Sequence, residues 1–156
     1  MKTANRIIAI CALALGLSSN AFAEDNKVSK VDPSSIYHRI GGGAAINAAV
    51  DLFYTKVLVD KRVNHFFEDV NMKRQKKRQK AFLSAALGGP VPYEGKTMRK
   101  AHAHLDLTEA DFGVIAGHLQ NTLKELKVDA KLVKEVMTVA ASTMNAVLNR
   151  PEPKKP

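Results

Sequence analysis

The apolar residues of this chain recur at helical spacing in three long segments. From residue 44 to residue 59 they fall three or four positions apart, which places them on one face of a helix. The same period recurs over residues 108–126 and 129–148, residues 72–87 are helical by composition, and no run alternates long enough to indicate a strand. The pattern therefore predicts an all-α domain over residues 36–149, with about four substantial helices.

Capping and turn residues mark the ends of these helices. The second helix is followed by Gly-Gly-Pro at 88–90, a sequence that ends helices. Thr108 and Asp111 have the spacing of a capping box, and Asp129 is placed to cap a single final helix. Between the first two helices lies NHFFEDV, with two adjacent phenylalanines. We expect one of them to face the core and the other to find a second apolar surface.

The chain begins like an export signal. Lys2 and Arg6 give the first residues positive charge, residues 7–17 form an apolar run, and Ala-Phe-Ala at 21–23 has the small-x-small pattern of a cleavage site. A transmembrane anchor is the competing interpretation, but the run is shorter than the ~20 residues that span a bilayer. We therefore expect residues 1–23 to be cleaved and the mature protein to be exported to a bacterial periplasm, without stable membrane insertion.

Removing the signal changes the composition in two ways. It takes away the single cysteine, Cys11, and it lowers the net charge from +9 to +7. A chain without cysteine has no disulfides, thiolate zinc sites, iron–sulfur clusters or thioether-linked haem. The positive charge suits anionic small molecules or membranes, and export makes nucleic acid the least expected partner. Residues 24–35 and 150–156 are polar and without periodicity, so they are predicted to be a flexible lead-in and a disordered tail.

Two histidines in the stretch MRKAHAHL are the strongest candidates for chemistry. His102 and His104 are two residues apart, so on a helix they point about 200° apart and cannot bind one metal ion. Met98, Ala101, His102 and Leu105 share one apolar face, whereas His104 lies on another. The pattern predicts that His102 faces inward and His104 faces solvent.

An inward histidine has two interpretations. It is most often a hydrogen-bonded core residue. It can also be a haem ligand, because the porphyrin supplies four in-plane nitrogens and the iron then needs a single protein ligand. Periodicity alone leaves both interpretations open.

Six landmarks occur in order along the predicted domain. They are IYHRIGG, DLFYTKVL, NHFFEDV, QKAFLSAALGGP, PYEGKTMRKAH and TEADFGVIAGHL. In this order and spacing they resemble the group I truncated haemoglobins, a family of shortened globins. The resemblance implies a two-over-two helical sandwich around non-covalent haem b, and it covers essentially the whole domain.

The resemblance also implies roles for individual residues. The proximal iron ligand corresponds to His102, and the polar residues that face bound gas correspond to Tyr54, Gln75 and Gln79. A phenolic hydroxyl and two carboxamides can donate hydrogen bonds to dioxygen, which would slow its release. Without the resemblance, the tyrosine reads as a core aromatic and the glutamines as solvated residues. The remaining haem contacts fall on Phe53, Phe67, Arg78, Phe82 and Met98.

Arg78 departs from part of the family. Some cyanobacterial relatives resemble this chain but carry at this position a histidine that can bind the iron from the distal side. Arginine cannot ligate iron, so the resemblance implies an open or water-occupied sixth coordination position. Arg78 is instead suited to pair with a haem propionate. The last predicted helix has no histidine, which argues against a covalent bond between histidine and haem.

Three functional hypotheses follow. The resemblance implies binding of dioxygen, nitric oxide and carbon monoxide at ferrous iron. Slow release of dioxygen favours nitric oxide dioxygenation, which needs an unidentified reductant. Reversible oxygen storage, delivery or sensing without catalysis is the alternative. A haem-free, basic, helical binding protein is the third hypothesis, and it gives His102 no role.

Overall fold

The computed structural model describes residues 32–151, which are helical with no strand in that range. The elements are α1 (Ile36–Arg39), α2 (Gly42–Val57), the 3₁₀ helix η1 (Asn64–Phe67), α3 (Met72–Ala86), α4 (Met98–His102), α5 (Glu109–Glu125), α6 (Ala130–Ser142) and α7 (Met144–Val147). The all-α prediction is confirmed. The predicted signal at 1–23 lies outside the described residues, as do most of the predicted lead-in and tail.

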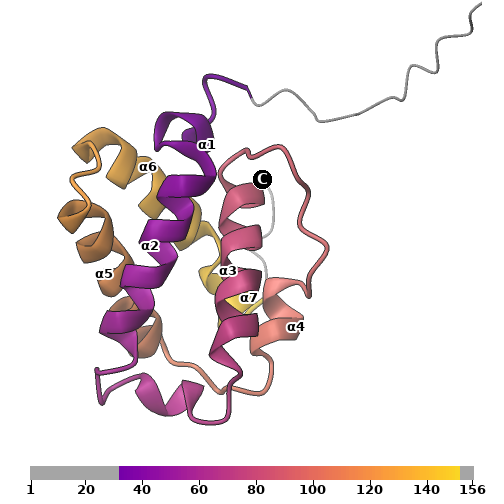
Figure 1. Cartoon of the computed structure of the whole chain (residues 1–156). Coiled ribbons are helices and arrows are strands. Elements are labelled where there is room, and N and C mark those ends of the chain that lie inside the picture. The colour runs from indigo at the N-terminus through magenta and orange to yellow at the C-terminus, as the bar shows by residue number, and fades with distance from the viewer. Residues whose placement is uncertain (1–31, 152–156) are drawn as a thin grey trace, which may run out of the picture.

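The long helices pack around α2. Helix α2 lies against α3 and α5, α5 lies against α6, and the short helices α4 and α7 contact each other. Figure 1 shows α2 in the middle, with α5 and α6 to one side and α3 and α4 to the other. The core consists mainly of residues that recur at helical spacing on α2, joined by residues of α5 and α6. They are Ile46, Ala49, Val50, Phe53, Tyr54, Val57, Leu123, Val133 and Val136.

Tyr37 joins the start of α2 to the end of α3. Its backbone N–H donates to the carbonyl of Leu87 at 2.7 Å. Its ring lies over the glycines at both helix ends, because a Cβ on Gly43 would come within 3.3 Å of the Tyr37 hydroxyl and a Cβ on Gly89 within 3.1 Å of the ring. The chain also leaves α3 through Gly88, whose φ of +85° suits glycine. The two glycine clusters therefore position α2 against α3.

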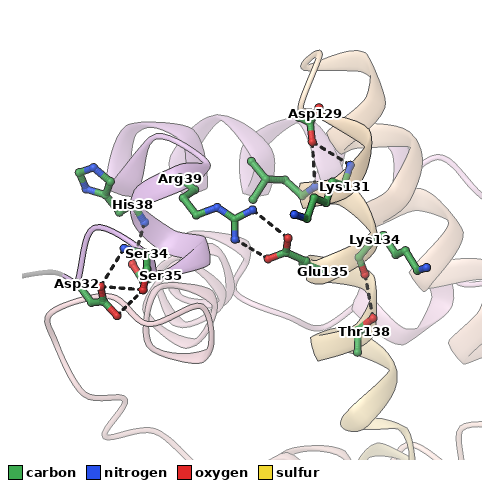
Figure 2. A network of polar contacts seen from close by, with 11 residues as sticks. Asp32, Ser34, Ser35, His38, Arg39, Asp129, Lys131, Lys134, Glu135 and Thr138 are labelled. Atoms are coloured by element: carbon green, nitrogen blue, oxygen red, sulfur yellow. Dashed lines mark hydrogen bonds and ion pairs between the residues drawn. The ribbon is translucent and has the colours of Figure 1, made fainter.

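Helix α1 is tied to α6 by a two-pronged ion pair. Arg39 donates from both terminal nitrogens to the Glu135 carboxylate, at 2.6 and 2.9 Å (Figure 2). The described part of the predicted lead-in is hydrogen-bonded: Asp32 accepts from Ser34, and Ser35 caps α1 by accepting from the N–H of His38.

The predicted caps are present. Thr108 and Asp111 form a reciprocal capping box at the start of α5, and the Asp129 carboxylate accepts two backbone N–H bonds at the start of α6. Asn71 caps α3 in the same way by accepting from the N–H of Arg74 at 3.0 Å.

The single final helix predicted by periodicity is broken in the structure, which ends α6 at Ser142 and begins α7 at Met144. The Thr143 N–H bonds the carbonyl of Ala140 at 3.1 Å, and its hydroxyl donates to the same carbonyl at 2.7 Å. Ser142 likewise donates to Val139. These bonds span three residues instead of four, and they bend the chain so that α7 meets α4.

Candidate functional site

A cavity of about 480 Å³ lies inside the helical sandwich, a size suited to a bound cofactor. Its walls come from α2, η1, α3, α4, α5, α6 and α7. The structure brings all nine predicted site residues to these walls: Phe53, Tyr54, Phe67, Gln75, Arg78, Gln79, Phe82, Met98 and His102.

Tyr54 and Gln75 form a polar pair within this mostly apolar wall. The Gln75 amide nitrogen donates to the Tyr54 hydroxyl oxygen at 3.1 Å. The tyrosine is only 2% exposed, and its ring meets Phe53 and Phe67 edge to face, with centroids 5.1 and 5.8 Å apart. Because the hydroxyl oxygen accepts from Gln75, the hydroxyl hydrogen is left to donate to another group.

Burial keeps this hydroxyl protonated. Desolvation raises the pKa of Tyr54 above its ordinary value of 10.0, and the hydrogen bond from Gln75 opposes that rise only in part. At neutral pH the group is therefore a neutral hydrogen-bond donor. Tyr54 is a core residue with an inward polar tip, and its hydroxyl is not at the surface.

Helix α3 presents different chemistry on different faces. Gln75 and Gln79, one turn apart, are half-buried and line the cavity. On a neighbouring face, Lys76 and Lys80 pair with Asp51 of α2 at 3.2 and 2.9 Å, which holds the two helices together. The ion pairs thus help to fix which face of α3 the glutamines occupy.

His102 lies on the α4 wall of the cavity. It is half-buried, and its Nδ1 lies 2.7 Å from the carbonyl oxygen of Met98. A carbonyl only accepts, so Nδ1 carries the hydrogen and Nε2 keeps its lone pair for a ligand. Met98, Ala101 and Leu105 line the cavity with it, as the periodicity predicts. His104 is exposed but borders the same cavity.

The exposed edge of the cavity is mainly cationic. Arg74, Arg78 and Lys96 line it and are exposed, while Asp69 is the only carboxylate among the described lining residues. Such an edge suits a ligand with carboxylate groups.

Comparisons with known proteins agree with this geometry. The family model for bacterial-like globins matches residues 35–149. A group 1 truncated haemoglobin of Chlamydomonas moewusii is 44% identical over 125 residues, covering 79% of this chain and 73% of that protein. One from Tetrahymena thermophila is 42% identical over 116 residues, covering 74% of this chain and 96% of that protein.

Solved structures of truncated haemoglobins also superpose on this chain. The truncated haemoglobin of Tetrahymena pyriformis in its Fe(III) form superposes with a TM-score of 0.71 at 44% identity, over 73% of this chain and 97% of that chain. The two-over-two haemoglobin of Synechococcus sp. PCC 7002, with covalently attached haem, also gives 0.71 at 44% identity, over 75% of this chain and 100% of that chain.

This chain belongs to the group 1 truncated haemoglobin family. The predicted two-over-two fold is confirmed by the structural neighbours. It is a family of haem-binding globins, and haem b is the cofactor that membership implies.

The side chains that line the cavity of this truncated haemoglobin are themselves suited to bind haem. It offers one imidazole nitrogen with a free lone pair, mostly apolar walls, and cations at the open edge where propionates would lie. Among residues 32–151 no group of three or more histidines, cysteines and carboxylates could hold a metal ion without a porphyrin. Within the same residues, no helix is long and apolar enough to cross a bilayer.

Sequence reasoning missed Tyr93 at this site. Its ring lies edge to face with Phe82, centroids 5.5 Å apart, and it lines the cavity. The ring folds back over Gly95, where a Cβ would come within 2.0 Å of its hydroxyl. The only signal was the PYEG sequence, which indicates a turn but not where the ring lies.

Both phenylalanines of η1 border the cavity, which corrects the expectation that only one would face the core. Both rings pack against the buried core, in which Val63, three residues before Phe66, is fully buried. Phe66 also stacks on His65 at a centroid distance of 4.0 Å.

The other histidines lie away from the cavity. His118 of α5 is half-buried, and its Nε2 lies 2.7 Å from the Asp60 carboxylate, in the turn after α2. Arg62 binds the same carboxylate, and together Arg62 and His118 hold the pKa of Asp60 well below its ordinary value. His38 is exposed at α1.

Proposed function

We propose that this truncated haemoglobin holds haem b through His102 Nε2 and retains dioxygen beside Tyr54, Gln75 and Gln79. The observation that carries this proposal is the Gln75–Tyr54 hydrogen bond, which leaves the buried tyrosine hydroxyl free to donate. When bound, ferrous haem supplies the position at which a diatomic gas is held and at which nitric oxide and dioxygen can combine to nitrate.

The chain's own residues then supply orientation and a dry environment. The Met98 carbonyl holds the imidazole of His102 in one tautomer. The hydroxyl of Tyr54 donates to the gas, while the amide of Gln75 orients that hydroxyl. The phenylalanine rings of α2 and η1 exclude water, which strengthens the donated hydrogen bonds.

Three structures of the Tetrahymena pyriformis protein support this assignment of polar residues. In them one tyrosine is replaced by phenylalanine, and each of two glutamines is replaced by glutamate. The replaced positions follow one another at the same intervals that separate Tyr54, Gln75 and Gln79 here.

Arg78 lies where some cyanobacterial relatives carry a histidine that can bind the iron. We expect Arg78 to bind a propionate at the cavity edge instead. Because a guanidinium does not ligate iron, the sixth position is proposed to be open or occupied by water. Carbon monoxide should therefore bind without first displacing a protein ligand.

Nitric oxide dioxygenation is the activity that slow dioxygen release favours. Each donated hydrogen bond contributes on the order of 1 kcal/mol, so two or three would slow release by roughly one to two orders of magnitude. A protein that keeps dioxygen in this way is a poor carrier but remains loaded until nitric oxide arrives.

The test is a rapid mix of the oxygenated ferrous protein with nitric oxide, followed by nitrate analysis. We expect one nitrate for each protein oxidised to the ferric state, and a lower yield in Tyr54→Phe, which loses dioxygen sooner. Displacement of dioxygen without nitrate would contradict dioxygenation and favour reversible storage, delivery or sensing.

Export to the periplasm is a separate proposal, supported by the sequence of residues 1–23. N-terminal sequencing of the protein expressed in a Gram-negative host tests it. A mature chain that starts at Glu24 and is recovered in the periplasmic fraction is expected, and an uncleaved chain in the cytoplasm would refute it.

A further inference from the structure

The cations in the first half of α3 fall into two sets. Lys76 and Lys80 are half-buried and paired with Asp51. Four others are exposed, and within residues 32–151 no carboxylate forms an ion pair with them; they are Lys73, Arg74, Lys77 and Arg78. We call these four residues the α3 cationic face.

This face lowers the stability of its own helix. Lys73 and Arg74 lie in the first turn, which contains no acidic residue, where the positive end of the helix dipole disfavours cations. Lys73 with Lys77, and Arg74 with Arg78, are like-charge pairs one turn apart and repel each other. Helix formation therefore does not explain why these residues are basic, and a negatively charged group from outside the chain would relieve the repulsion.

The face lies at the open edge of the cavity. Arg74 and Arg78 line that edge together with Lys96, and Asp69 is its only described carboxylate. The two propionates of haem would pair with at most part of this charge. Lys73 and Lys77, which do not line the cavity, remain to interact with solvent or a partner.

We propose that the α3 cationic face is the docking surface for an acidic electron-donor protein. The proposal rests on the proposed function, because turnover with nitric oxide leaves ferric haem. One electron passes from the reduced centre of the donor, which is oxidised, to ferric haem, which becomes ferrous. Charge complementarity would bring the donor to the edge of the cavity in which the haem would be held.

The shape of the face favours a protein over a membrane. Its cations are confined to residues 73–78, a stretch of less than two turns, and no exposed apolar residue lies among them. Small charged patches of this kind suit brief electron-transfer encounters, whose interfaces are small. Membrane-surface helices combine basic residues with a large apolar face that enters the lipid.

The experiment measures how fast the ferric holoprotein is reduced by an acidic [2Fe–2S] ferredoxin, with photoreduced riboflavin as a small reductant that needs no docking surface. The test variant is Lys73→Glu/Lys77→Glu. It should fold about as well as the wild type, because glutamate at position 73 suits the first helical turn, and the like-charge pair at positions 73 and 77 is repulsive in both proteins. The control, Lys124→Glu/Lys134→Glu, makes the same change in net charge at exposed positions of α5 and α6.

At low ionic strength we expect the ferredoxin rate constant to fall by roughly tenfold or more in the test variant and by less than about twofold in the control. Salt should slow the wild type and barely affect the test variant. Riboflavin should reduce all three proteins at the same rate.

Equal losses in both variants, or none in either, would overturn the docking proposal. So would wild-type binding to phosphatidylglycerol vesicles that is lost in the test variant while ferredoxin reduction is unchanged, because the face would then serve a membrane. A missing haem spectrum would overturn the proposed function as well. If the haem spectrum and the reduction by riboflavin are normal but the ferredoxin rates differ from those expected, only the docking proposal is contradicted.

Discussion

At the scale of single residues, the site depends on His102 and Tyr54. The hydrogen bond that each side chain forms determines which of its atoms remains free to bind a ligand. Met98 fixes the tautomer of His102, and Gln75 leaves the Tyr54 hydroxyl hydrogen available. Periodicity alone places His102 inward, but it does not show a hydrogen-bonded Tyr54. A tyrosine at a core position can direct its hydroxyl to solvent or to the interior, and only the packed rings of Phe53 and Phe67 decide between them.

Replacing Tyr54 by phenylalanine should speed dioxygen release by roughly tenfold, because one donated hydrogen bond of about 1–1.5 kcal/mol is lost. Stopped-flow displacement of dioxygen by carbon monoxide measures the rate. Gln75→Leu should give a smaller increase, since it removes the group that orients the hydroxyl. An unchanged rate in Tyr54→Phe would show that the hydroxyl does not reach the bound gas.

At the scale of helices, the sequence predicts starts better than it predicts ends and bends. The capping box of Thr108 and Asp111 is readable because both partners lie within one turn. The break at Thr143 is not readable, since serine and threonine occur in unbroken helices, and apolar residues continue at helical spacing across the break.

Gly89, just after α3, and Gly113, within α5, give a matched pair of predictions about glycines in and beside helices. A Cβ at Gly89 would lie 2.6 Å from the Ser84 carbonyl oxygen, so Gly89→Ala should lower the free energy of unfolding by roughly 1–3 kcal/mol. A Cβ at Gly113 meets nothing within 4 Å, so Gly113→Ala in α5 should be neutral or stabilising by up to ~1 kcal/mol. Urea unfolding of the holoproteins compares them. Equal effects of the two changes would mean that the close approach to Ser84 does not matter.

At the scale of the whole molecule, polar contacts between distant segments hold the cavity walls in place. Arg39 joins α1 to α6, and His118 joins α5 to the turn that leads into η1. Sequence patterns predicted the fold class, and the family landmarks predicted many of the residues that line the cavity. They could not predict Tyr93, because its position depends on how the loop after α3 folds back onto Phe82, or the Asp60–His118 contact, because its partners are far apart in the chain.

The Asp60 contact predicts a dependence of stability on pH. Since the folded pKa of this carboxyl lies below its ordinary value of 3.8, its contribution is present above that value and is lost as the pH falls through the folded pKa. Asp60→Asn should therefore unfold at lower urea concentration than the wild type at pH 6, and the difference should shrink below pH 3.8. A difference that stays constant across this range would show that the charge of Asp60 contributes nothing.

The most direct test of the central claim is the absorption spectrum of the purified mature protein, recorded oxidised, reduced under nitrogen, and then with carbon monoxide and dioxygen. We predict a haem spectrum whose ferrous form takes up both gases. His102→Ala should lose the wild-type coordination, while His104→Ala, two residues away at the cavity edge, should keep it. The absence of a haem band after addition of hemin, or a wild-type spectrum in His102→Ala, would contradict the account.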